Sequence, residues 1–121
     1  MAKENNRILV ISDKALDCQL YNVKYDVVTW KTCTLRKWLN DDFFNSAFTD
    51  AEKMCIPTVT VSADKNPKYS TYSGKTTKDK IFLLSTKEAE KYFVDDEERK
   101  CIPTDYAIAQ GVYTSDNHTI N

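Results

Sequence analysis

The sequence predicts a single α+β domain over residues 1–121, and three observations support this class. The chain is 41% hydrophobic and 29% charged, a balance typical of a protein with one buried core. Apolar residues recur at helical spacing after Trp30, whereas residues 58–62 alternate like a half-buried strand. We therefore expect an ordered core over 7–113, followed by a frayed polar tail over 114–121.

Three segments have the pattern of strands. Residues 7–12 form a continuous apolar run, which predicts a strand covered on both faces. Residues 58–62 predict a half-buried strand, and residues 80–85 predict another buried one. The segment 12–29 is expected to be a loop with short extended pieces. The polar segment 62–79 is long for a loop in a compact domain, and such loops are functional or mobile.

The clearest predicted helix follows Trp30. The hydroxyl of Thr32 or Thr34 is expected to cap its first free amides. The two faces of this helix differ in polarity, as expected for a helix packed on a core. The apolar face holds Leu35, Trp38, Leu39 and Phe43, and the polar face holds Arg36, Lys37, Asn40 and Asp41.

Three shorter helices are predicted from their end signals. Thr49-Asp50-Ala51-Glu52 fits a reciprocal capping box, and this helix must end before Pro57. Ser85-Thr86-Lys87-Glu88 fits a second capping box. Thr104 is placed to cap a last helix that ends at Gly111.

Charge and the N-terminal segment exclude some classes of protein. Lysine and arginine number 17 against 18 acidic residues, without a basic stripe, so nucleic acid is not an expected partner. The run Ile8–Ile11 is too short for a signal sequence or a membrane span. We expect a cytoplasmic protein if the chain is complete, and no location follows if it is an excised domain.

The cysteines do not predict a metal or cofactor site. Cys18, Cys33, Cys55 and Cys101 form no CxxC pair, and His118 lies far from them in the sequence. We expect no cofactor and no metal, and mostly buried, reduced thiols. Cys33 and Cys55 remain the candidates for an alternative in which the protein is a thiol-dependent enzyme; no catalytic residue is assigned.

One motif resembles part of a phosphate-binding loop. Ser73-Gly74-Lys75-Thr76 contains its GKT ending, but Tyr69 stands where the motif requires glycine. The strand before it and the helix after it are also absent from the predicted elements. Nucleotide binding is therefore not expected.

Tyrosines in two loops are the main candidates for a binding surface. Tyrosine gives large contact area at low entropic cost, which is why recognition surfaces use it. The candidate ligand-binding residues are Tyr69, Tyr72 and Lys75 in the long loop, with Tyr21 and Tyr25 in the early loop. The alternative is that these rings fold back over a sheet edge.

An ordered set of residues resembles a known family. The set begins with Trp30-Lys-Thr-Cys-Thr-Leu-Arg-Lys-Trp-Leu-Asn40 and continues through Phe43-Phe44-Asn45, Asp79-Lys-Ile-Phe-Leu-Leu-Ser85 and Tyr106-Ala107. It looks like the bacterial domain-of-unknown-function family 6273, found widely in gut Firmicutes, and the likeness covers about Ile8 to Gly111. The resemblance implies a C-type-lectin-like fold, similar to that of sulfatase-modifying domains, with two main helices on a short curled antiparallel sheet.

The resemblance implies no established activity, because a fold does not define a function. Members of this family usually continue into a tryptophan-rich C-terminal part that this chain lacks. No calcium or copper ligand can therefore be transferred to it. From these features we expect a non-enzymatic binding or interaction module. The alternative is a fragment or subunit that completes its fold by association with a second copy or with a larger parent protein.

Overall fold

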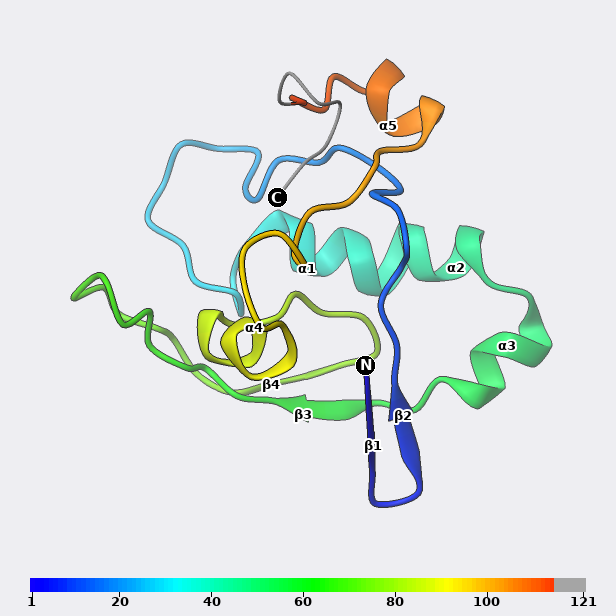
Figure 1. Cartoon of the computed structure of the whole chain (residues 1–121), viewed down its shortest axis with the longest axis horizontal. Helices are drawn as coiled ribbons and strands as arrows, with labels where there is room; N and C mark the ends of the chain where they lie inside the picture. Colours follow the sequence, from blue (N-terminus) through cyan, green and yellow to red (C-terminus); the bar gives the residue numbers. More distant parts are fainter. Residues whose placement is uncertain (115–121) are drawn as a thin grey trace. The chain divides into compact units, whose positions relative to one another are not determined.

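The computed structural model describes residues 1–114 and confirms the α+β class, with short helices and two small antiparallel sheets (Figure 1). The chain divides into two compact units. Unit 1 contains Met1–Gln19 and the chain from Glu88 onward, and unit 2 contains Leu20–Lys87. The single domain over 1–121 stays a prediction. Most of the predicted tail, residues 115–121, lies outside the described residues.

Unit 1 begins with a β-hairpin. Strand β1 (Ala2–Glu4) pairs antiparallel with β2 (Arg7–Leu9), and the two-residue turn consists of Asn5 and Asn6. Both asparagines have positive φ, 46° and 62°, as a turn matching the twist of the strands requires. Asparagine tolerates this left-handed backbone better than most residues.

The predicted buried strand over 7–12 is wrong in both length and burial. The strand ends at Leu9, and the side chains of Ile8, Val10 and Ile11 are exposed. The sheet contains only β1 and β2, and Val10 and Ile11 lie beyond its last paired residue.

Both helices of the C-terminal half begin at their predicted positions, and the capping box at Ser85 stays a prediction. Helix α4 (Thr86–Tyr92) starts directly after Ser85. Helix α5 (Asp105–Ala109) is capped by Thr104, whose hydroxyl accepts a hydrogen bond from the amide of Ala107. Gly111 follows with φ +92°, the left-handed conformation expected after a helix end.

The main helix of unit 2 is continuous but not uniform. It comprises α1 (Thr34–Trp38), a π-helical turn η1 (Leu39–Phe43) and α2 (Phe44–Ala47). Its N-cap residue is Cys33, without a side-chain cap, so the expectation of Thr32 or Thr34 is wrong. Both hydroxyls already have other donors: Thr32 accepts from the amide of Thr29, and Thr34 from that of Val23.

The next helix confirms its capping box. Helix α3 (Asp50–Cys55) is preceded by Thr49, whose hydroxyl accepts from the amide of Glu52. The Glu52 carboxylate in turn accepts from the amide of Thr49 at 2.7 Å. The helix ends before Pro57, as predicted.

The sheet of unit 2 has two strands. Strand β3 (Val59–Val61) confirms the predicted half-buried strand, since Val61 is buried and Thr60 is exposed. Its antiparallel partner is β4 (Thr77–Asp79), which lies within the segment predicted as loop. Residues 80–85 are not a strand, which corrects the prediction made for them.

The core of unit 2 is small and rich in aromatic rings. Cys33, Phe44 and Val61 are its buried apolar residues. The rings of Phe44 and Phe48 lie 5.8 Å apart, and the ammonium group of Lys80 lies 4.2 Å from the Phe44 ring. Among the described residues, no helix is long and apolar enough to cross a membrane.

Candidate functional site

A buried carboxylate organises unit 2. The side chain of Asp79, at the end of β4, has 0% exposure. Its Oδ1 accepts from Arg36 Nε at 2.7 Å and lies 2.7 Å from the second guanidinium nitrogen. Its Oδ2 accepts from the indole nitrogen of Trp30 at 3.0 Å and from the hydroxyl of Thr77. The four side chains connect the helix, the segment before it and the sheet.

These hydrogen bonds keep Asp79 charged despite its burial. Burial alone raises the pKa of a carboxyl, because it removes water from the charged form. Hydrogen bonds from Arg36, Thr77 and Trp30, together with the charge of Arg36, outweigh burial and hold the pKa of Asp79 below its ordinary value of 3.8. The carboxylate is thus a structural anion with every close partner donating to it.

Asn40 fixes the chain after β4 in the same way. Its Oδ1 accepts from the amides of Lys80 and Ile81, at 2.8 and 3.2 Å. Its Nδ2 donates to the carbonyl of Ile81 at 2.8 Å and to that of Arg36 at 3.1 Å. A side chain therefore takes the backbone groups that a strand partner would need at Lys80 and Ile81, the start of the predicted strand.

Except for Thr77, the side chains of this network belong to the segments that carry the family resemblance. Arg36 and Asn40 were placed on the polar face of the helix, and both are half-buried, because they bond to β4 and to the chain after it. Asp79 was not singled out at all. A partial signal was available: Asp79 and Lys80 sit between a threonine-rich segment and an apolar run, where a charged residue requires a partner if it is buried.

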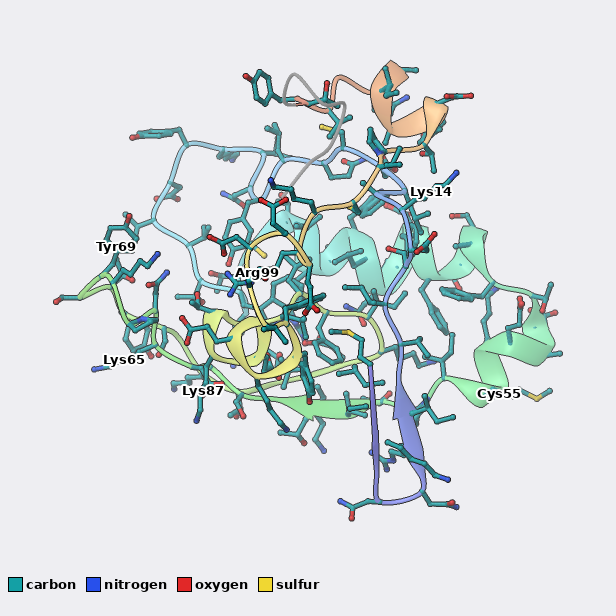
Figure 2. The ribbon with its side chains drawn as sticks, viewed as in Figure 1. Lys14, Cys55, Lys65, Tyr69, Lys87 and Arg99 are labelled. Atoms are coloured by element: carbon teal, nitrogen blue, oxygen red, sulfur yellow. The ribbon has the colours of Figure 1, made fainter. Side chains whose placement is uncertain are left out.

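Two loops of unit 2 carry the predicted binding residues. The first loop, residues 20–31, contains Tyr21 and Tyr25; the second loop, residues 62–76, contains Tyr69, Tyr72 and Lys75. In Figure 1 the first loop is light blue, the second is green, and both extend to the left of the view. Figure 2 shows Tyr69 on the outer part of the second loop.

The first loop is attached to the start of α1 through its backbone. The carbonyl of Tyr21 accepts from the amide of Leu35 at 3.2 Å. The Asn22 side chain accepts from the amide of Thr34, and the Thr34 hydroxyl accepts from the amide of Val23. Free amides at the helix start are thereby satisfied, and the loop is held at three consecutive residues.

The second loop touches the first at a glycine. Gly74 has φ +89°, and a Cβ placed there would lie 2.8 Å from the Cβ and hydroxyl of Thr29. Only glycine allows this close approach together with this backbone conformation. The same segment that resembled a nucleotide-binding loop therefore joins two loops, and the strand β4 follows it where that motif requires a helix.

The five predicted site residues do not behave alike. Tyr25, Tyr69, Tyr72 and Lys75 are exposed. Tyr21 is 44% exposed. Its partial burial raises the pKa of Tyr21 to about 12, and the charge of Cys33 and a hydrogen bond with Cys33 contribute to the same shift. Tyr21 is thus partly a structural residue, and the other four remain free for contact with a ligand.

The two candidate thiols lie in different surroundings. Cys33 is buried, and its thiol donates to the carbonyl of Trp30 at 3.3 Å. Cys55 is exposed at the end of α3, against the expectation of buried thiols. His118 lies outside the described residues. Within residues 1–114, no group of three or more histidine, cysteine or acidic side chains is placed to hold a metal ion.

Comparison with known proteins defines the family but not a function. The chain is a mixed α+β protein with a helix-to-sheet polar network. Residues 5–119 match the model of a family described as Domain of unknown function (DUF6273). The chain belongs to this family. No curated protein and no solved structure matches it.

Proposed function

We propose that the chain is a non-enzymatic binding module that uses the two loops of unit 2. The observation that carries this proposal is a set of exposed apolar and aromatic side chains on loops with a held backbone. Val27 has 99% exposure, and Val23, Tyr25, Tyr69 and Tyr72 are also exposed. Larger exposed apolar patches mark interaction sites, and these five exposed side chains all belong to the two loops.

The hydrogen bonds of the first loop and the Gly74 contact reduce the entropy that a ligand would have to remove on binding. Preorganisation of this kind is what makes exposed tyrosines effective anchors. A thiol enzyme has less support, since the buried thiol of Cys33 is already engaged with a backbone carbonyl.

The test is a screen of a peptide and glycan library with the purified chain and with a variant carrying Tyr25→Ala, Tyr69→Ala and Tyr72→Ala. We expect ligands that bind the parent and lose binding to the variant, at an unchanged melting temperature. The matched control is Tyr113→Ala, an equally exposed tyrosine of unit 1, which should retain binding. Ligands that bind all three proteins equally would contradict the proposal.

A different observation supports a second function, association with another copy of the chain. The β1–β2 hairpin leaves Ile8, Val10 and Ile11 exposed beside strands that pair only with each other. Exposed strand edges bind further strands, so this hairpin supports the alternative of association with a second copy. Sedimentation of the parent and of Ile8→Lys across a wide concentration range tests it. Association that ignores this substitution would contradict the hairpin as the interface.

The C-type-lectin-like fold and the bacterial origin are proposed from the resemblance. Their support is the shared order of the motifs after Trp30. An experimental structure and its comparison with lectin-like domains would test the fold.

A further inference from the structure

Charge is distributed unequally between the two units. Unit 2 contains 11 lysine and arginine residues against 7 acidic ones, whereas the sequence of unit 1 contains 6 against 11. The net charge of the whole chain, −1, is therefore the sum of a basic unit 2 with net charge +4 and an acidic unit 1 with net charge −5. Such asymmetry points to electrostatic recognition by one part of a chain.

The excess positive charge of unit 2 is concentrated in its two loops. The loops contain five exposed lysines, and within residues 1–114 none of them forms an ion pair. The loops also contain two acids, Asp26 and Asp64, so five lysines against two acids leave an excess of three positive charges. The lysines are Lys24, Lys31, Lys65, Lys68 and Lys75.

The Gly74 contact brings charge and apolar surface together. Consecutive Cα atoms are 3.8 Å apart, so the Cα atoms of Tyr72 and Lys75 lie within about 8 Å of that of Gly74. By the same argument, Val27 and Lys31 lie within about 8 Å of Thr29. The backbone around this contact therefore carries an exposed tyrosine, an exposed valine and two exposed lysines. We call these four residues the Gly74 patch.

From this surface we infer that the partner is an acidic polypeptide segment that also carries apolar side chains. This inference rests on the proposed function and names its ligand class. Carboxylates complement the unpaired lysines, and apolar side chains complement Val27 and Tyr72, whose exposed surface only apolar groups can cover favourably. Neither loop contains arginine, the residue that best recognises phosphates by bidentate hydrogen bonds. The exposed aliphatic side chain of Val27, which an apolar side chain can cover, favours a polypeptide over a nucleic acid.

The experiment measures binding of labelled peptides to the full chain by fluorescence anisotropy. The first probe is a peptide of about ten residues, about 33 Å when extended, in which glutamate alternates with leucine. The second replaces each glutamate with glutamine, and the third replaces each leucine with serine. We expect the first to bind at least tenfold more tightly than either other probe, and its binding to weaken with added salt.

Protein variants then locate the site. Replacing Lys31 and Lys75 of the Gly74 patch, together with Lys65 of the second loop, by glutamine should weaken binding of the first probe about tenfold. The matched control neutralises three exposed lysines outside the loops, Lys14, Lys37 and Lys87, and should leave binding within twofold. Figure 2 shows Lys65 on the second loop and Lys87 on α4.

The outcomes separate this inference from the proposed function. If peptides bind through the loop tyrosines but the lysine variant binds normally, the binding module stands and the acidic partner is overturned. Tighter binding of single-stranded DNA or of an anionic polysaccharide than of the first probe also overturns it. If neither the tyrosine nor the lysine variant changes binding of any probe, both proposals fail.

Discussion

Unit 2 places an ion pair in its interior, whereas unit 1 carries ion pairs at its surface. Arg36 and Asp79 meet beneath the main helix, with the carboxylate fully covered. In unit 1, Arg99 pairs with Asp96 and Lys100 with Glu97, three residues apart along an exposed turn. The same chemical pair thus has different tasks: Arg36–Asp79 makes a long-range connection, whereas the pairs of unit 1 act locally, as does the Lys53–Asp50 pair of unit 2.

Separation along the chain underlies this difference. Arg36 and Asp79 are 43 residues apart, so their pairing joins the helix to the sheet. The pairs of unit 1 close a turn whose own backbone already brings them together, since the amide of Lys100 donates to the carbonyl of Glu97. Breaking the first removes a tertiary connection, and breaking the second removes a contact that water can replace.

The largest expected effect is that of Arg36→Met. It leaves the Asp79 carboxylate buried without its cation, which costs about 3 kcal/mol of unfolding free energy. Urea unfolding measures it, and Lys37→Met, an exposed neighbour on the same helix, is the control with an effect near zero. Equal stability of the two variants would show that the buried pair does not hold unit 2 together.

Lowering the pH should test the same Arg36–Asp79 pair, because it protonates the Asp79 carboxylate. Because the folded pKa of Asp79 lies below 3.8, the carboxylate stabilises the folded state above that pH. This contribution disappears as the pH falls through the folded pKa. The difference in unfolding free energy between the parent and Arg36→Met should therefore shrink when urea unfolding is repeated from pH 7 down to about pH 2.5. A difference that stays constant over this range would contradict the assignment.

Substitution of two glycines, one in each unit, should cause an intermediate loss of unfolding free energy. Both have φ near +90°, but a Cβ at Gly74 would meet Thr29, whereas a Cβ at Gly111 would meet nothing within 4 Å. Gly111→Ala should cost about 1 kcal/mol from backbone strain alone. Gly74→Ala should cost about 2 kcal/mol, because a steric clash adds to that strain. Thermal unfolding measures both, and equal costs would mean that the loop contact is not tight.

Local signals predicted local structure well. The capping box at Thr49, the cap at Thr104 and the left-handed Gly111 all follow from side chains that act within a few residues. The alternation over 58–62 likewise predicted β3. These features could be read from the sequence because the interacting groups are neighbours in it.

Features that depend on distant partners could not be predicted in this way. The apolar run 80–85 has strand composition, yet the side chain of Asn40 occupies its first backbone groups. The run 7–12 has the composition of a buried strand, yet its strand ends at Leu9 and the side chains of Ile8, Val10 and Ile11 are exposed. Arg36 fits a polar helix face until Asp79 is placed beside it. The candidate loops were identified as tyrosine-rich, but the Thr29–Gly74 contact that joins them has no sequence signal beyond the glycine itself.

The smallest expected effect is that of the Glu97–Lys100 pair. Its atoms approach to 2.6 Å, but 78% of the Glu97 side chain is exposed, so water and salt screen the attraction. A double-mutant cycle with Glu97→Ala and Lys100→Ala should give a coupling of about 0.5 kcal/mol or less by urea unfolding. The short distance is therefore a poor guide to energy here, and burial is the better one. A coupling as large as the effect of Arg36→Met would remove the distinction between the two units.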